Sequence, residues 1–247
     1  MIRVAAVADV HFGADSAGTL RPHLADLGAR ADVLLVAGDL TRRGDPDEAA
    51  ILAGELHGLG VPTFAVLGNH DLHLDRREAL CAVLERAGIR MLDGDSAVVD
   101  VRGQRLGIAG VKGFGVGFRG ASCSDFGEPI TRAYFAHARD EACRLEALLR
   151  DLAGRCDLRI ALMHYSPVQE TLIGERPEIW AFLGSYLLAE AVDRAGADLA
   201  LHGHAHAGRE RGTTPAGVPV RNVAQPVIRS AYRLFCLGDG QPSEVAC

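Results

Sequence analysis

Residues 61–71 read VPTFAVLGNHD, and this stretch decides the fold of the chain. Its first part, Pro62–Leu67, is a short apolar run of the kind that forms a buried β-strand. Its last part, Gly68–Asp71, changes abruptly to glycine, asparagine, histidine and aspartate. Because ligands of α/β proteins bind beyond the carboxyl ends of the strands, this change predicts one part of a binding site.

Two earlier stretches repeat this pattern. Ile2–Ala8 is an apolar run followed by Asp9 and His11, and Val33–Ala37 is another one, followed by Gly38 and Asp39. Between these runs the apolar residues follow the spacing of helices. The alternation of strands and helices predicts a parallel sheet with right-handed crossovers, which places the chain in the α/β class.

Short polar motifs mark the predicted helix boundaries in this half of the chain. Asp45 can cap a helix that begins at Pro46 and ends at Gly60. Asp75 and Glu78 predict a capping box ahead of the next helix.

The second half of the chain contains further strands. A hairpin is predicted to join Ala97–Val101 to Leu106–Gly110. Other strand candidates lie at residues 158–163, 198–201, 218–223 and 232–237, and helix candidates lie at 140–152 and 185–195. His164 follows the first of these strands, and His204 and His206 follow the second. No low-complexity linker or internal repeat divides the chain, so residues 1–247 are predicted to form a single domain.

The polar residues that follow five of the strands should converge on one edge of one sheet. The seven that can bind a metal are Asp9, His11, Asp39, Asn69, His164, His204 and His206. Imidazoles and carboxylates suit transition metals, and seven groups exceed the about four to six ligands of one ion. Two ions that share a bridging carboxylate would explain the excess. Such a pair activates water and stabilises both the attacking and the leaving oxygen of an in-line displacement.

The chain resembles the calcineurin-like metallophosphoesterase family in the order of five motifs: Asp9-x-His11, Gly38-Asp39, Gly68-Asn69-His70-Asp71, His164, and Gly203-His204-x-His206. These motifs span positions 9 to 206. The resemblance implies a four-layer α/β/β/α sandwich of two mixed β-sheets flanked by helices. In that sandwich the hairpin and the C-terminal strands would build the second sheet.

The resemblance also implies a role for each motif residue. Asp9, His11 and His206 would bind one metal ion. Asn69, His164 and His204 would bind the other, with Asp39 as the bridge. The ions would be Mn²⁺, Fe or Zn²⁺.

Two further residues would be catalytic. The resemblance makes His70 a proton donor to the leaving alcohol. Asp71 would orient His70 through its second ring nitrogen, as carboxylates do for many ligand histidines.

The substrate class stays open among several alternatives. A compact, bacterial-type phosphodiesterase is favoured because the chain lacks an obvious monoester-specific insert, and a small-molecule phosphomonoesterase is the alternative. A phosphoprotein phosphatase is disfavoured, because Arg42 stands where that subgroup has aspartate and Asp71 stands where it has glutamate. The glycine-rich segment Gly110–Gly127 is either a substrate lid, with Lys112 or Arg119 reaching a second phosphate, or a solvated loop. A metal-bound scaffold without turnover would need no His70.

Composition narrows the partners and the compartment. A net charge of −6 argues against a stable nucleic-acid partner and leaves a small phosphorylated substrate. No apolar run is long enough for a bilayer or a signal peptide, and six scattered cysteines predict thiols, so we expect a cytoplasmic protein without membrane association. A homodimer is a further expectation. The segment Tyr165–Gly184, which contains Trp180, is the candidate interface or a second lid.

Overall fold

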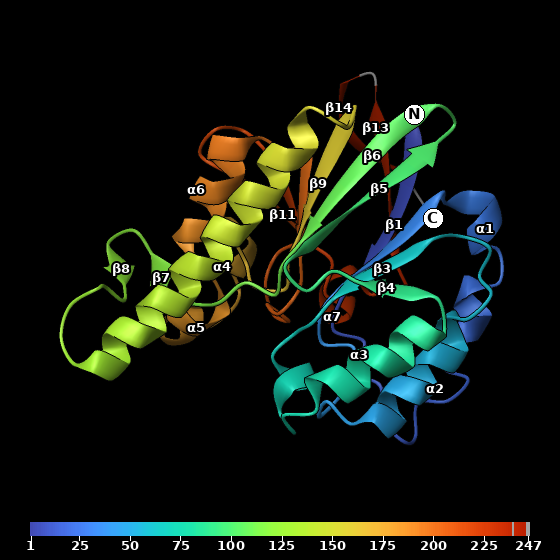
Figure 1. The fold of residues 1–247 in the computed structure, drawn as a ribbon, viewed down its shortest axis with the longest axis horizontal. Coiled ribbons are helices and arrows are strands. Elements are labelled where there is room, and N and C mark those ends of the chain that lie inside the picture. Colours follow the sequence, from blue (N-terminus) through green and yellow to red (C-terminus); the bar gives the residue numbers. More distant parts are fainter. Residues whose placement is uncertain (239, 246–247) are drawn as a thin grey trace.

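The computed structural model of the chain describes residues 1–238 and 240–245. Two six-stranded mixed sheets pack face to face, and helices cover the outer face of each sheet (Figure 1). This arrangement confirms the four-layer α/β/β/α sandwich that the sequence motifs implied. Among the described residues, every helix is too short or too polar to span a bilayer.

The first sheet has the strand order β14-β13-β1-β2-β3-β4. Its strands are β1 (Ile2–Val7), β2 (Val33–Ala37), β3 (Thr63–Val66), β4 (Ile89–Met91), β13 (Arg233–Gly238) and β14 (Gly240–Val245). Strands β1 to β3 are parallel, as the alternating sequence pattern predicted. Strand β4, which the pattern did not predict, pairs parallel with β3. The prediction that all C-terminal strands join the second sheet is wrong for β13. It pairs antiparallel with β1, with Leu237 opposite Ile2, and so occupies the edge of β1 that β2 leaves open.

The second sheet has the strand order β11-β12-β10-β9-β6-β5. Its strands are β5 (Asp95–Val101), β6 (Gln104–Gly110), β9 (Leu158–Leu162), β10 (Leu199–His202), β11 (Arg211–Thr213) and β12 (Pro219–Asn222). The predicted hairpin is confirmed as β5 and β6. Its two turn residues, Arg102 and Gly103, have positive φ angles of 52° and 79°, which matches the twist of a tight hairpin. A small separate hairpin pairs β7 (Gly117–Phe118) with β8 (Ala121–Ser122).

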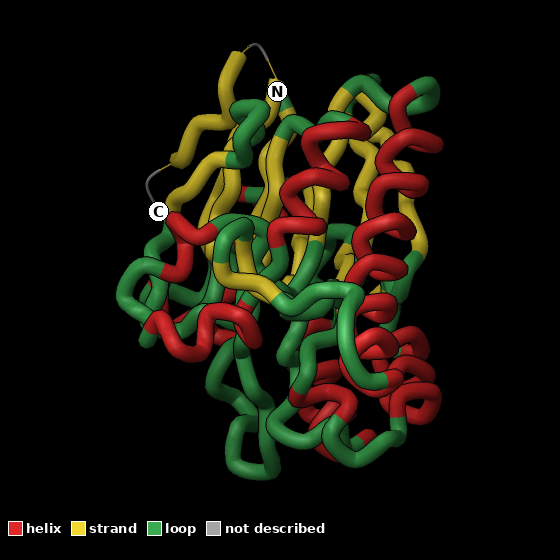
Figure 2. The backbone as a smooth tube through the Cα atoms, turned by 90° about the vertical axis from the view of Figure 1, so that its left-hand side faces the viewer, coloured by secondary structure: helices red, strands yellow, loops and turns green. Residues whose placement is uncertain are grey.

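Helices form the two outer layers. The first sheet is covered by α1 (Leu27–Arg30), α2 (Pro46–Leu56) and α3 (Arg77–Arg86). The second is covered by α4 (Pro129–Ala153) and α6 (Tyr186–Ala195), which Figure 2 shows side by side in front of the strands. The short helices are α5 (Trp180–Leu183), α7 (Gln225–Ile228), and the 3-10 turns η1 (Arg21–Leu24), η2 (His70–Leu72), η3 (Gln169–Leu172) and η4 (Pro177–Ile179).

Helix α4 begins at Pro129, well before the predicted start near Asp140. Its buried stripe begins only at Ala138, and Ile130 in the first turn is 73% exposed. The first turns of the helix therefore contain no buried side chain, and the sequence pattern missed them.

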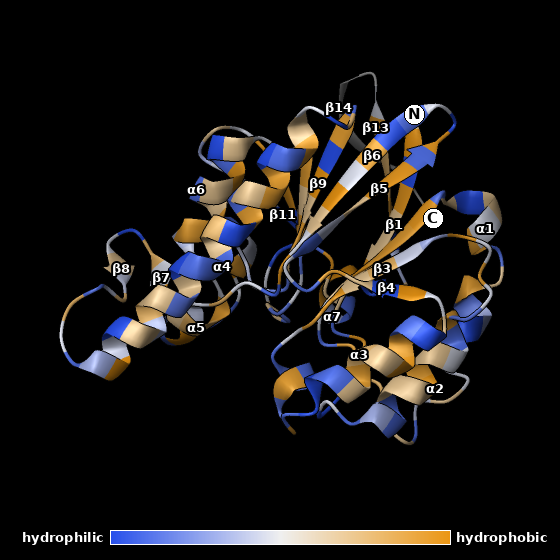
Figure 3. Ribbon diagram, viewed as in Figure 1, coloured by the Kyte–Doolittle hydropathy of each residue, from blue (hydrophilic) through white to orange (hydrophobic). Residues whose placement is uncertain are grey.

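Three apolar cores hold the four layers together. On β1, Ala5 and Val7 face the helices, whereas Ile2, Val4 and Ala6 face the second sheet. A third core joins the second sheet to α4 and α6. Strands buried on both faces read as continuous apolar runs, and the strands in Figure 3 are accordingly mostly hydrophobic.

Two predicted helix caps have different outcomes. The carboxylate of Asp45 accepts a hydrogen bond from Asp47 N at 3.1 Å, so the predicted cap of α2 is confirmed. The capping box at Asp75 is wrong. Asp75 N bonds to Leu72 O within a turn and Asp75 has a φ of 54°, so α3 starts two residues later, at Arg77, without a side-chain cap.

Five cysteines lie in the described residues as free thiols: Cys81, Cys123, Cys143, Cys156 and Cys236. The sixth, Cys247, lies outside the described residues. Cys236 is buried and Cys143 is exposed, so the five thiols differ in their exposure to solvent.

We expect Asp45→Ala to lower the free energy of unfolding by about 1 kcal/mol, because it removes the acceptor for an otherwise unpaired helix N–H. Asp45→Asn should retain most of the stability, since asparagine caps helices equally well. Urea unfolding of the three proteins measures both effects. An asparagine variant as unstable as the alanine variant would show that the carboxylate charge, not the cap, stabilises this end of α2.

Candidate metal centre

All seven predicted metal ligands lie together, but they come from two sheets. Asp9 and His11 follow β1, Asp39 follows β2 and Asn69 follows β3. His164 follows β9, and His204 and His206 follow β10. The prediction that these residues converge on one edge of a single sheet is therefore wrong. Face-to-face packing places the carboxyl ends of β1 to β3 beside those of β9 and β10, so the site lies between the sheets.

The candidate ligand atoms form two groups that share one carboxylate. The first group is Asp9, His11, Asp39 and His206, and the second is Asp39, His164 and His204. Within each group the atoms lie within 4.8 Å of one another. Asn69 Oδ1 lies beside the second group, 3.0 Å from His164 Nε2. This donor set fits two cations bridged by Asp39.

In the first group, ring nitrogens and carboxylates face each other closely. His206 Nε2 lies 2.9 Å from Asp9 Oδ1 and 3.5 Å from His11 Nε2. The hydrogen bond to Asp9 raises the pKa of His206, whereas burial lowers the pKa of His11. Such a cluster is costly without positive charge, which a bound cation would supply.

In the second group, backbone carbonyls orient the histidines. His164 Nδ1 lies 2.9 Å from Ala37 O, which leaves Nε2 facing Asn69 and Asp39. His204 Nε2 lies 3.2 Å from Phe182 O, which leaves Nδ1 as the free nitrogen. Burial lowers the pKa of His204 to about 3, so its ring is neutral at pH 7 and can offer a lone pair to a metal.

Four candidate ligands have a strained backbone. Asp9, His11, Asp39 and His204 have positive φ angles of 57°, 44°, 49° and 70°. This left-handed region costs non-glycine residues about 1–3 kcal/mol each and is concentrated at functional sites. The backbone strain is therefore concentrated at the candidate site.

Two glycines allow the closest contacts of the site. A Cβ at Gly68 would overlap with the carboxylate and backbone nitrogen of Asp39. A Cβ at Gly203 would overlap with the Asp9 carboxylate. The strand-end glycines are therefore required because the candidate ligands pack directly against their backbone.

His70 lies at the rim of the centre. Its side chain is 46% exposed, and its Nε2 lies 4.0 Å from Asp39 Oδ2. Its Nδ1 lies 2.9 Å from Arg42 O. Because a carbonyl oxygen only accepts, Nδ1 carries a proton and Nε2 is the nitrogen that faces the centre.

The predicted contact between Asp71 and His70 is wrong. The fully buried Asp71 carboxylate accepts hydrogen bonds from Leu40 N, Thr41 N and Gly68 N, and from Thr41 Oγ1, at 2.7–3.1 Å. Burial and the charge of Asp39 raise the pKa of Asp71 to about 6, while these donors oppose that shift. Asp71 thus joins the loop after β2 to the loop after β3, and the carbonyl of Arg42 orients His70 instead.

Three residues that the sequence did not predict as part of the site contribute their backbone carbonyls. The carbonyls of Ala37, Arg42 and Phe182 set the orientation of three histidines. Every residue has a carbonyl, so the sequence holds no signal for this role. Thr41, which donates to Asp71, follows Asp39 closely but belongs to no recognised motif here.

The segments Gly110–Gly127 and Tyr165–Gly184 were predicted as possible lids, and their contacts differ from those predicted. Arg119 pairs with Glu190 and lies over the ring of Tyr186, at 5.1 Å from its centre, so it faces α6 rather than a second phosphate. Lys112 is 9% exposed and lies over the Tyr165 ring, and burial lowers its pKa to about 8. The Tyr165–Gly184 segment contributes to the centre through the carbonyl that Phe182 offers to His204. Its role as a dimer interface stays a prediction.

We expect Gly68→Ala to reduce the metal content of the protein severely without changing any candidate ligand, because the added methyl group displaces the Asp39 carboxylate. Gly54→Ala in α2 is the matched control, since a Cβ there meets no atom within 4 Å. Elemental analysis after loading with Mn²⁺ measures the effect. Equal metal content in the two variants would mean that Asp39 is not the shared ligand.

Three solved structures share this fold at low sequence identity. Phosphopantetheinyl hydrolase (PptH) from Mycobacterium tuberculosis is 19% identical with a TM-score of 0.70, and the match covers 96% of each chain. A putative 5′-nucleotidase from Staphylococcus aureus is 16% identical with a TM-score of 0.59, over 100% of this chain and 53% of that one. GAP50, the anchor in the inner membrane complex of Plasmodium, is 12% identical with a TM-score of 0.61, over 98% and 83%.

The family relationship rests on the sequence match. No curated protein sequence matches the chain. The family model described as calcineurin-like phosphoesterase matches residues 2–208, which include every candidate ligand and His70. The resemblance drawn from the five motifs is confirmed: the chain belongs to the calcineurin-like phosphoesterase family and is a metal-dependent phosphoester hydrolase.

Proposed function

We propose that the protein hydrolyses a small phosphodiester at a centre of two metal ions, with His70 as the proton donor. The observation that carries this proposal is the shared Asp39 carboxylate. It belongs to both groups of candidate ligands, and the Nε2 atom of His70 lies 4.0 Å from it. Asp9, His11 and His206 would hold one ion, and Asn69, His164 and His204 the other.

The bound ions would polarise the phosphoryl group and lower the pKa of a water molecule that attacks it. The protein supplies the remaining parts. Asp9 and Asp39 are 3% and 1% exposed, and their carboxylates balance the positive charge of the ions. His70 holds one proton on Nδ1 against Arg42 O, so its protonated ring can release the proton on Nε2 to the leaving oxygen.

The basic residues around the centre favour a diester over a monoester. A phosphomonoester carries up to two negative charges at neutral pH, and a diester carries one. Arg42 pairs with Asp15 at 2.7 Å, Arg119 pairs with Glu190, and the Lys112 amine donates to a backbone carbonyl at 2.7 Å. These three basic side chains are thus already engaged, so none of the three is held ready for a second anionic oxygen.

The fold neighbours suggest substrates to assay. PptH is by name a phosphopantetheinyl hydrolase, and its chain has the same extent as this one. The putative 5′-nucleotidase favours nucleotides as the monoester alternative. GAP50, an anchor, represents the alternative of a scaffold without turnover, for which the placement of His70 would have no use.

The experiment that tests the proposal combines metal analysis with paired substrates. The purified protein is assayed with Mn²⁺ on bis(p-nitrophenyl) phosphate and on p-nitrophenyl phosphate. We expect about two metal ions per chain, as a bridged centre requires, and faster hydrolysis of the diester. Faster hydrolysis of the monoester would overturn the diester assignment. One ion or none per chain would overturn the bridged centre.

We expect His70→Ala to lower kcat by about 10²–10⁴-fold, because general acid catalysis contributes that much. The metal content should not change, since His70 is not a proposed ligand. His73→Ala is the matched control, because His73 is an exposed histidine at the end of the same turn. Equal kcat values for the two variants would remove His70 from the mechanism.

A further inference from the structure

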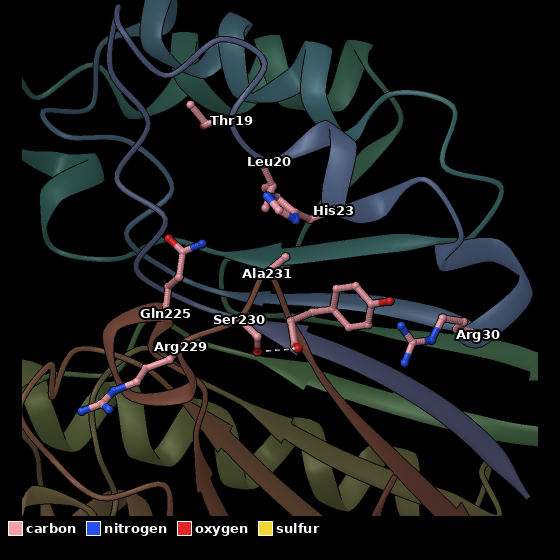
Figure 4. A pocket seen from close by; sticks show the side chains of 9 residues that line it. Thr19, Leu20, His23, Arg30, Gln225, Arg229, Ser230 and Ala231 are labelled. Atoms are coloured by element: carbon pink, nitrogen blue, oxygen red, sulfur yellow. Dashed lines mark hydrogen bonds between the residues drawn. The ribbon is translucent and has the colours of Figure 1, made fainter. Parts of the chain in front are cut away.

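A cavity lies apart from the metal centre. It has a volume of about 480 Å³, and none of the candidate metal ligands lines it. Figure 4 shows Thr19 and His23 from the N-terminal segment on one side, and Gln225, Arg229 and Ser230 from the segment around α7 on the other. This size is within the range of about 300–1,000 Å³ of small-molecule sites.

The residues that line this cavity are basic or neutral, whereas the chain as a whole is negatively charged. The lining includes Arg30, Arg229 and His23 but no aspartate or glutamate, although the chain has a net charge of −6. Asp26 lies near one end, with its Oδ2 3.7 Å from Arg30 Nη1, and it offsets part of that arginine's charge. The cavity therefore favours a negatively charged ligand.

Three polar side chains of the lining are not engaged. Within residues 1–238 and 240–245, the side chains of His23, Gln225 and Arg229 make no hydrogen bond or ion pair. Each can donate N–H groups. A ligand with acceptor oxygens would therefore gain these hydrogen bonds without breaking any inside the protein.

The backbone at Arg229 is strained. Arg229 follows α7 with φ 51° and ψ 35°, the left-handed conformation that usually selects glycine after a helix. An arginine in this position carries backbone strain that a glycine would avoid.

We propose that this cavity binds a small ligand through one or two phosphate groups, at a site distinct from the metal centre. The fork of the Arg229 guanidinium matches the oxygens of a phosphate. His23 and Gln225 supply further donors on the lining, and Arg30 supplies positive charge at the other end. This site does not depend on which ester the metal centre hydrolyses.

Crystals of the metal-loaded protein soaked with tungstate locate the site, because tungstate has the shape and charge of phosphate and a strong anomalous signal. We expect an anomalous peak within hydrogen-bond distance of the Arg229 guanidinium, separate from any peak at the metal centre. Excess inorganic pyrophosphate should displace it. A peak at the metal centre alone would overturn the proposal.

Calorimetric titration with inorganic pyrophosphate measures the affinity. Arg229→Gly should weaken binding at this cavity about tenfold or more, since a hydrogen-bonded charge pair is lost. Glycine suits the left-handed backbone, so the variant should fold. Arg229→Lys should retain part of the affinity, and Arg86→Ala, an exposed arginine of α3, should retain all of it. Unchanged binding by Arg229→Gly, or a dissociation constant above about 10 mM in the wild type, would overturn the proposal. Ester hydrolysis should be equal in Arg229→Gly and Arg86→Ala.

Discussion

The site depends on one buried carboxylate, that of Asp39. It is 1% exposed, and its two oxygens lie 3.4 Å from His164 Nε2 and 3.7 Å from His11 Nε2. One side chain thus faces histidines from both sheets. A buried charge is stable only when it is paired, so cations between these groups would stabilise the packing of the sheets at this end of the sandwich.

The sequence predicts the polar residues that follow the strands better than it predicts the place of each strand within the two sheets. Asp9, Asp39 and Asn69 were predicted to lie at the same sheet edge and do lie there, because parallel neighbours bring their carboxyl ends to that edge. The division of the ligands between two sheets was not predictable in this way. Periodicity shows that a segment is a strand but not which strand it pairs with. The same limit misplaced β13, whose pairing joins Leu237 to Ile2 from opposite ends of the chain.

Asp71 shows where assignment by motif reaches its limit. A carboxylate next to a catalytic histidine in the sequence suggested a direct hydrogen bond, but its oxygens are occupied by donors from the loops after β2 and β3. These loops carry Asp39 and His70. Asp71 therefore holds the proposed bridge and the proposed proton donor in register, and its influence on His70 passes through the backbone to the carbonyl of Arg42.

The proposed ligands also hold the fold of their own site. Both oxygens of Asp9 lie within 3.1 Å of His204 N in the other sheet, and Asp39 Oδ1 accepts from His70 N at 2.9 Å. These hydrogen bonds stabilise the left-handed turns at Asp9, Asp39 and His204, whose strain would otherwise favour rearrangement. The carboxylates are therefore positioned by contacts with the protein that need no metal. Because this geometry is formed in advance, binding two cations requires little reorganisation of the protein. More of the interaction energy therefore contributes to the affinity for the ions.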